Sequence, residues 1–315
     1  MTPSKNYVDQ IHPDFRRFRF LNRPLPGLFP KKVANFFLRK IYKQIKMSDG
    51  ISTIYKTIKG FEGRNLNIEI YQPKQSDELS PCIIAFHGGG FCYAALPWHK
   101  KLFDIYVNKT KAKLVFVDYT LTTKKPFPAG AEDCYLASRW VHAHATELGI
   151  DENRILLYGD SAGGALAAIV AQMLRDRNQF SPIFQMLIYP ITDGRMQTES
   201  AKKYTHVPIW NTRCTQDANK LYVKGYKPPY PAYAFPTQAS GFSNLPSAFI
   251  EVAEFDSLRD EGLNYATALQ NGGTTVEVSE IKGAIHAFEL NTKSEITRKA
   301  VEHRVRIMNR VLNEI

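Results

Sequence analysis

The sequence around residue 160 places one serine where it can act as a nucleophile. Gly159-Asp160-Ser161-Ala162-Gly163 has the pattern G-x-S-x-G, with an apolar run before it and a helix-like stretch after it. The flanking glycines allow a sharp strand-to-helix turn that exposes the serine hydroxyl at the edge of a sheet. The start of the following helix also favours negative charge nearby. The pattern therefore predicts Ser161 as a nucleophile.

A serine hydroxyl is a weak nucleophile and needs a base. Where this turn is used, the partners follow in the chain order serine, acid, histidine. His286 and His303 lie beyond both Ser161 and the last predicted strand, which covers 275–281. His303 stands between charged residues in a helix, which indicates a solvated position. The loop that holds His286 reaches the carboxyl edge of the sheet, so we expect His286 to be the base.

The acid should follow the preceding strand, because it must reach the same edge of the sheet. Asp256 comes directly after the strand predicted over 247–255 and before a helix. Aspartate is also a favoured helix N-cap, so Asp260 and Asp193 remain open as alternatives. In this arrangement the acid orients the imidazole and stabilises its charged form.

Three consecutive glycines follow another predicted strand. His87-Gly88-Gly89-Gly90 comes at the end of the apolar run over 82–87. Acyl transfer needs backbone N–H donors aimed at the developing oxyanion, and side chains there would block the substrate carbonyl. Gly88, Gly89 and Ala162 are expected to supply these donors. A phosphate-binding loop is the rival, but the Lys-Ser/Thr pair and the G-x-G-x-x-G spacing are both missing.

Composition limits the remaining possibilities. The 315 residues are 44% hydrophobic and 12% aromatic, which is typical of a globular chain. The four cysteines form neither a disulfide framework nor a metal-ligand pattern, so we expect them to be reduced and structural. The predicted chemistry at Ser161 needs no metal and no organic cofactor, and we expect none. No run of about 18 apolar residues is present, so stable membrane insertion is not expected. The charged N-terminus does not fit a signal peptide, which favours a cytoplasmic location.

The net charge of +11 is concentrated at the N-terminus, since residues 1–47 hold eleven Lys or Arg and two acids. Within that segment, 33–47 has the pattern of an amphipathic helix. Its apolar stripe consists of Val33, Phe37, Ile41 and Ile45. We favour a surface helix with a solvated basic face, and recruitment to a membrane surface is the alternative. No nucleic-acid-binding motif accompanies the charge, so nucleic acid is not an expected partner.

The elements that must position these residues alternate between strand and helix. This order predicts an α/β fold, with a mostly parallel sheet of about eight strands and helices on both faces. The predicted strands cover 53–59, 66–72, 82–87, 113–119, 154–159, 184–190, 247–255 and 275–281. Segments 1–48 and 191–238 break the rhythm. We expect them to form a cap over a core made of 49–190 and 239–315.

The two glycine motifs together resemble those of the hormone-sensitive-lipase-like carboxylesterases, which have the α/β-hydrolase fold. The resemblance covers about residues 80–290. "FDSLRDEG" (255–262) is similar to the family's D-x-LRDEG and supports Asp256, and "GAIHAF" (283–288) supports His286. The family also implies a cap built from an N-terminal segment and an insertion. Two features depart from it: "LTTKK" (121–125) replaces LAPE, and Ser257 stands where proline is usual.

These observations predict a serine carboxylesterase that hydrolyses short-acyl esters of small molecules. Phe91, Tyr93 and Trp210 are the candidate pocket residues. Two alternatives remain open, a non-catalytic small-molecule receptor on the same fold and an amidase or peptidase with the same triad. A homodimer is possible by analogy with the family.

Overall fold

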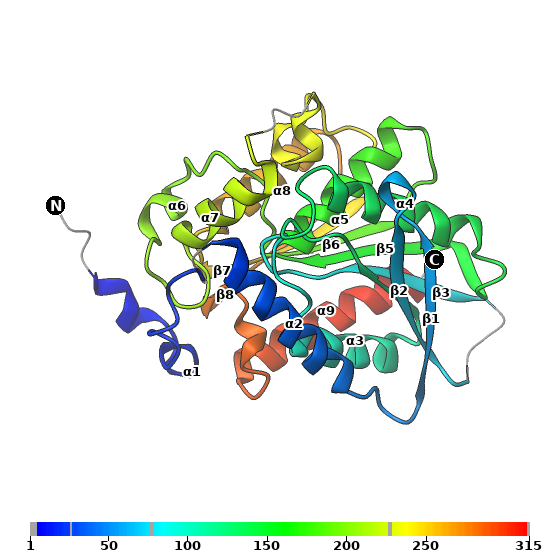
Figure 1. Cartoon of the computed structure of the whole chain (residues 1–315), viewed down its shortest axis with the longest axis horizontal. Helices are drawn as coiled ribbons and strands as arrows, with labels where there is room; N and C mark the ends of the chain where they lie inside the picture. Colours follow the sequence, from blue (N-terminus) through cyan, green and yellow to red (C-terminus); the bar gives the residue numbers. More distant parts are fainter. Residues whose placement is uncertain (1–4, 26, 76–78, 226–228, 314–315) are drawn as a thin grey trace.

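The computed structural model describes residues 5–25, 27–75, 79–225 and 229–313. In this part of the chain, eight strands form one sheet in the order β1-β2-β4-β3-β5-β6-β7-β8, and the sheet is the central layer of the molecule (Figure 1). The strands are β1 (Ile51–Lys59), β2 (Asn65–Pro73), β3 (Ser80–Phe86), β4 (Lys113–Asp118), β5 (Ile150–Asp160), β6 (Phe184–Ile188), β7 (Ser247–Phe255) and β8 (Val276–Ile285). The predicted α/β fold is confirmed.

The central strands with continuous apolar runs are parallel, as their hydrophobic pattern predicts. β3 to β8 are all parallel to one another, whereas β2 is antiparallel to both β1 and β4. Every residue of β3 and β6 is buried, as expected for strands covered on both faces. The most C-terminal predicted strand is longer than expected, because β8 runs to Ile285. This extension brings the end of β8 directly to His286.

Helices cover both faces of the sheet (Figure 1). α3 (Pro97–Thr110) and α9 (Glu295–Asn313) pack on one face. α4 (Ala129–Ala143), α5 (Ala162–Asp176) and α8 (Arg259–Asn271) pack on the other. The carboxyl ends of the parallel strands lie at the same edge of the sheet, and the predicted site residues lie in the loops at that edge.

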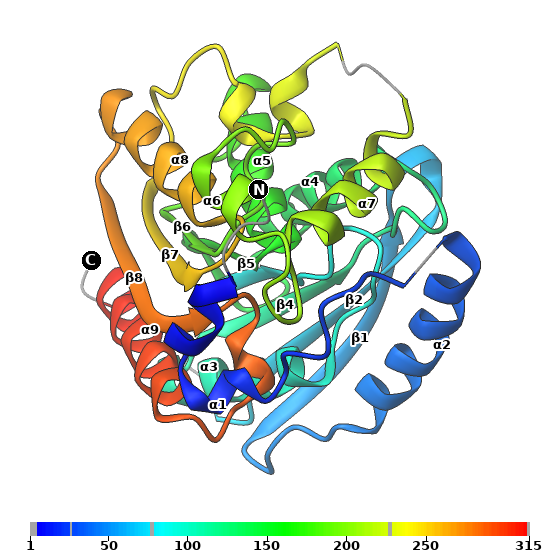
Figure 2. The same ribbon diagram turned by 90° about the vertical axis from the view of Figure 1, so that its left-hand side faces the viewer.

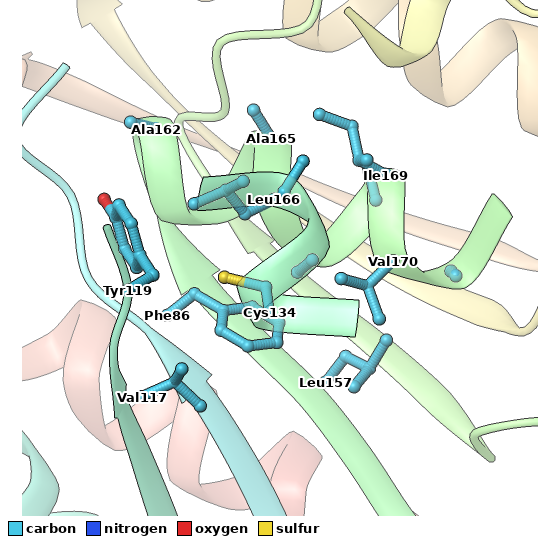
Figure 3. Close-up of a cluster of buried hydrophobic side chains, with 14 of the residues drawn as sticks. Phe86, Val117, Tyr119, Cys134, Leu157, Ala162, Ala165, Leu166, Ile169 and Val170 are labelled. Carbon is cyan, nitrogen blue, oxygen red and sulfur yellow. The ribbon is translucent and has the colours of Figure 1, made fainter. Parts of the chain in front are cut away.

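The core beneath this edge is closely packed. Figure 3 shows side chains from β3, β5, α4 and α5 meeting, among them Phe86, Leu157, Cys134, Leu166 and Val170. All five are fully buried. Burying an apolar side chain of this size contributes about 1.5–3 kcal/mol. This packing fixes the ends of β5 and α5, and therefore the turn between them.

The N-terminal segment and the segment after β6 lie against each other. The first contains α1 (Pro13–Arg16) and α2 (Leu28–Gln44), and the second contains α6 (Glu199–Lys203) and α7 (Thr212–Val223). Figure 2 shows α1, α6 and α7 on the side that faces the viewer. The backbone N–H of Ile209 donates to the carbonyl of Leu21, and Asn211 donates to the carbonyl of Asn22 at 2.9 Å.

Helix α2 forms where the amphipathic pattern predicts a helix, but its apolar stripe faces outward. Val33, Phe37 and Ile41 are 41%, 55% and 45% exposed. The buried positions are instead polar or amphipathic, and they include Asn35 and Tyr42. Buried hydrogen bonds of Asn35 and Tyr42, together with the packing of Leu38 and Tyr42 on the core, decide which side of the helix meets the protein. Among the described helices, none is long and apolar enough to cross a bilayer.

Candidate active site

Ser161 lies at the junction of β5 and α5 in a backbone conformation that is rare for a residue with a side chain. Its φ is 54° and its ψ is −118°. Ser161 N–H donates to the carbonyl of Ile188 at 2.8 Å, and Ile191 N–H donates to the carbonyl of Ser161 at 3.1 Å. A Cβ on either flanking glycine, Gly159 or Gly163, would overlap backbone atoms. The surrounding chain therefore holds a strained turn that presents the hydroxyl.

The structure brings Ser161, His286 and Asp256 together. His286 Nε2 is 2.9 Å from Ser161 Oγ, and His286 Nδ1 is 2.6 Å from Asp256 Oδ2. All three residues are buried. Since the carboxylate accepts at Nδ1, that nitrogen carries the proton and Nε2 is free to accept from the serine hydroxyl. Asp256 also accepts the N–H of Leu258 at 2.9 Å through Oδ1, so it serves both the helix entry and the imidazole.

The alternative residues have other partners. Asp260 accepts the N–H of Ser200 at 2.7 Å, and Asp193 forms an ion pair with Arg195 at 2.7 Å. His303 lies on α9, 3.4 Å from a glutamate of β8. Among the described acidic residues, only Asp256 forms a hydrogen bond or ion pair with the His286 ring.

The glycine loop after β3 differs from the prediction at one position. Gly88 N–H donates to Asp160 Oδ1 at 3.1 Å, so Gly88 has no free amide to offer an oxyanion. Gly89 and Gly90 have φ values of 122° and 57°, which favour glycine. Within residues 79–225, the amides of Gly89, Gly90 and Ala162 donate no hydrogen bond to the chain. These three N–H groups are the available donors beside Ser161.

A buried network that the sequence reasoning missed holds this loop. His99 Nε2 is 3.0 Å from Asp160 Oδ2, and Leu96 N–H donates to His99 Nδ1 at 2.8 Å. Because Nδ1 accepts the N–H of Leu96, the ring proton of His99 is on Nε2, which donates it to Asp160. Burial disfavours the Asp160 charge, but His99 and the Gly88 N–H outweigh burial and hold the pKa of this carboxyl below its ordinary value. His99 belongs to no motif, so no local signal points to it.

His87 supports the same loop from below. Its ring is fully buried and stacks on Tyr119 with 4.4 Å between ring centroids. Tyr119 Oη donates to the His87 carbonyl at 2.8 Å. Burial, assisted by the neighbouring His99, lowers the pKa of His87 to about 3. His87 is thus neutral at physiological pH and positions the loop.

A cavity of about 470 Å³ opens beside Ser161. Tyr93 and Trp210, two of the three candidate pocket residues, line it, and the Trp210 ring centroid lies 5.9 Å from that of His286. The prediction for Phe91 is wrong, because Phe91 is buried outside the cavity and stacks on Tyr222 at 3.8 Å. With φ 60°, the backbone at Phe91 turns this side chain into the core.

One ion pair interrupts the mostly apolar wall of the cavity. Lys31, from α2, lies 2.6 Å from Asp217 of α7 and is almost fully buried. The pair joins the two segments that were expected to form the cap. No group of three metal-ligating side chains is found in the described part of the chain.

A second buried charge cluster lies behind His286. The Tyr189 ring centroid is 4.6 Å from that of His286, and Tyr189 Oη donates to Glu289 Oε2 at 2.5 Å. Arg304, fully buried on α9, forms ion pairs with both Glu289 and Glu251. Burial disfavours the Arg304 charge, but the two carboxylates outweigh it and raise the pKa of the guanidinium. This cluster ties the His286 loop to β7 and α9.

Comparison with known proteins places this chain in a family. Residues 83–290 match a family described by the α/β hydrolase fold. The esterase LipI of Mycobacterium tuberculosis (strain ATCC 25618 / H37Rv) is 35% identical over 228 residues, which cover 71% of each chain. Carboxylesterase NlhH of the same strain is 34% identical over 261 residues, 82% of each chain. The chain belongs to the hormone-sensitive-lipase-like family of α/β-hydrolases.

Other relatives of this hydrolase agree with that assignment. An ethyl acetate hydrolase of Pseudomonas putida is 30% identical over 230 residues, 72% of each chain. The crystal structure of a thermostable esterase from Pseudomonas putida ECU1011 superposes with a TM-score of 0.87 at 28% identity, covering 96% of this chain and 98% of that one. The hydrolase is therefore a carboxylic ester hydrolase.

Proposed function

We propose that this hydrolase is a serine carboxylesterase that cleaves short-acyl esters of small molecules. The observation that carries the proposal is the relay from Ser161 Oγ to His286 Nε2 at 2.9 Å and from His286 Nδ1 to Asp256 at 2.6 Å, beside a cavity. The distances suit proton transfer along the relay.

The reaction follows from these positions. Ser161 Oγ attacks the ester carbonyl while His286 Nε2 takes its proton. The amides of Gly89, Gly90 and Ala162 donate to the oxyanion of the tetrahedral intermediate, and Gly90 replaces Gly88 in this role. The intermediate collapses when His286 returns the proton to the leaving alcohol. This step leaves an acyl-enzyme with the acyl group on Ser161 Oγ. Water attacks that ester while His286 takes its proton, and His286 then returns the proton to Ser161 Oγ as the acid is released.

Trp210 is the residue that would limit the length of the acyl group. Trp210 lies close to His286 and bounds the cavity of about 470 Å³. Residues 1–48 and 191–238 supply much of the wall, and we propose that they act as a cap over the core. The name of one relative, ethyl acetate hydrolase, points to the same substrate class.

Hydrolysis of a p-nitrophenyl ester series from acetyl to dodecanoyl tests the proposal. Wild type should favour the short chains, and Ser161→Ala should lose activity, whereas the exposed-serine control Ser240→Ala should keep it. A matched p-nitroanilide should turn over far more slowly than the ester, and equal rates would favour the amidase alternative. Undiminished turnover by a folded Ser161→Ala would overturn the mechanism.

A further inference from the structure

The outward face of α2 is an unusually apolar surface for a folded protein. We call it the α2 stripe; it consists of Leu28, Phe29, Val33, Phe36, Phe37 and Ile41. Phe29 is 75% exposed and Phe36 is 66% exposed. Phe20 and Leu21, which precede α2 in the chain, are also exposed, at 80% and 58%. Contiguous apolar patches of this kind mark interaction sites.

This face is outward because the opposite face is firmly bound. Asn35 donates to the carbonyl of Cys92 at 2.8 Å and accepts the N–H of Ala94 at 2.9 Å. Tyr42 shares a hydrogen bond of 3.0 Å with Tyr71 on β2. These contacts fix the rotation of the helix, so the α2 stripe cannot turn inward without breaking buried hydrogen bonds.

The surface around the α2 stripe carries one sign of charge. Residues 15–47 contain ten Lys or Arg and no Asp or Glu. Lys31 and Arg39 are neutralised by Asp217 and Asp118. Lys32, Lys40 and Lys43 are exposed and interleave with the stripe, and none of the three forms an ion pair with another described residue. Apolar side chains among unpaired lysines are the pattern of a helix that lies in an anionic lipid interface.

The α2 stripe also reaches the mouth of the site. Phe37 and Ile41 line the same cavity as Ser161 and His286. If the stripe lies on an apolar phase such as a bilayer, a ligand dissolved in that phase can pass along Phe37 and Ile41 into the cavity.

We propose that the α2 stripe docks this hydrolase on anionic lipid membranes, where it takes lipid-soluble esters from the bilayer surface. A second copy of the chain is a poorer occupant, because pairing through this face would bring two acid-free basic surfaces together. Docking is peripheral, through Phe29 and Phe36 in the interface and the lysines on the headgroups. The part concerning substrate delivery rests on the proposed esterase function.

Co-sedimentation with phosphatidylcholine vesicles, with and without phosphatidylglycerol, tests the docking. Wild type should bind only the vesicles that contain phosphatidylglycerol, and more weakly at high salt. Phe29→Ser/Phe36→Ser and Lys32→Gln/Lys40→Gln/Lys43→Gln should each weaken binding, the lysine variant by on the order of 100-fold.

Matched controls change similar side chains elsewhere on the surface. Tyr55→Ser removes an aromatic ring that is 70% exposed on β1. Lys202→Gln/Lys282→Gln/Lys299→Gln removes three exposed charges outside residues 15–47. Both controls should bind vesicles like wild type. Equal losses in the control and α2 variants, or no binding by wild type, would overturn the proposal.

Two further readouts separate the remaining possibilities. p-Nitrophenyl acetate in solution should be hydrolysed equally by wild type and the α2 variants, because none of the substituted residues lines the cavity. An acetate ester of a long-chain alcohol, carried in the vesicles, should be hydrolysed more slowly by the α2 variants. Vesicle binding by a protein without esterase activity would refute the proposed function alone. A shift from dimer to monomer in Phe29→Ser/Phe36→Ser, without vesicle binding by wild type, would instead assign the stripe to self-association.

Discussion

Replacing His99 by leucine tests whether the buried network beneath the glycine loop positions the oxyanion donors. The variant keeps apolar bulk but removes the Nε2–H that lies 3.0 Å from Asp160. Asp160 would then keep Gly88 N–H as its remaining partner among those described above. Hydrogen bonds to a charged group contribute about 1.5–3 kcal/mol, and leaving a buried charge without its partner costs about 3–5 kcal/mol. We expect a loss of stability in the range of about 2–5 kcal/mol.

The same change should slow the reaction through the loop. Asp160 holds Gly88, and Gly88 sets the position of the two glycines that follow it. Full loss of one oxyanion donor lowers kcat by about 10²–10³-fold. A loop that is displaced but still present should lower kcat by no more than this. We expect kcat for p-nitrophenyl acetate to fall by about 10- to 1000-fold while KM changes little, because the donors act mainly in the transition state.

The pH dependence distinguishes this network from simple packing. In the wild type the pKa of Asp160 is below its ordinary value, so its contribution to stability is present above about pH 4 and is lost as the pH falls further. In His99→Leu, burial would raise that pKa, so the charged form becomes unfavourable near neutrality. The difference in unfolding free energy should therefore be largest near pH 7 and shrink toward acid pH.

Guanidinium unfolding at several pH values and steady-state kinetics give both measurements. His142→Leu is the control, since His142 stacks on Phe180 at 4.2 Å and has no ion pair with a described carboxylate. Unchanged kcat in a destabilised His99→Leu would refute the positioning role. A stability loss that does not vary with pH would refute the electrostatic reasoning.

Three further predictions concern the cavity and the buried charges. Trp210→Ala should shift the ester preference toward longer acyl chains, by up to about fourfold for each added methylene, in the p-nitrophenyl series. Arg304→Met should lower the free energy of unfolding by about 3–5 kcal/mol in guanidinium titrations, because it leaves Glu251 and Glu289 buried without a cation. In the wild type, His87 takes up a proton more readily in the unfolded chain than in the folded protein, so the free energy of unfolding should fall between about pH 6.5 and pH 3. His87→Phe should make this fall smaller. An unchanged dependence of the unfolding free energy on acid pH would contradict the prediction.

Short-range chemistry made much of the site visible in the sequence. The strained turn at Ser161 needs glycine on both sides, and a parallel sheet needs its loops at one edge. The motif around Ser161 and the strands before Asp256 and His286 were enough to propose that the serine, an acid and the histidine meet. Asp260 and Asp193 stayed open as the acid until the resemblance to the family supported Asp256. Their separations of 2.9 Å and 2.6 Å come from the packed sheet.

Tertiary structure decided the features that depend on partners far along the chain. The sequence pattern predicts that the Gly88 amide is free to bind an oxyanion, but this N–H donates to Asp160, 72 residues later. His99 acquires its role from that same carboxylate, 61 residues away. The apolar stripe of α2 faces outward because buried hydrogen bonds of Asn35 fix the other side of the helix. Local periodicity reports which residues share a face, but the partners that satisfy buried polar groups determine where that face points.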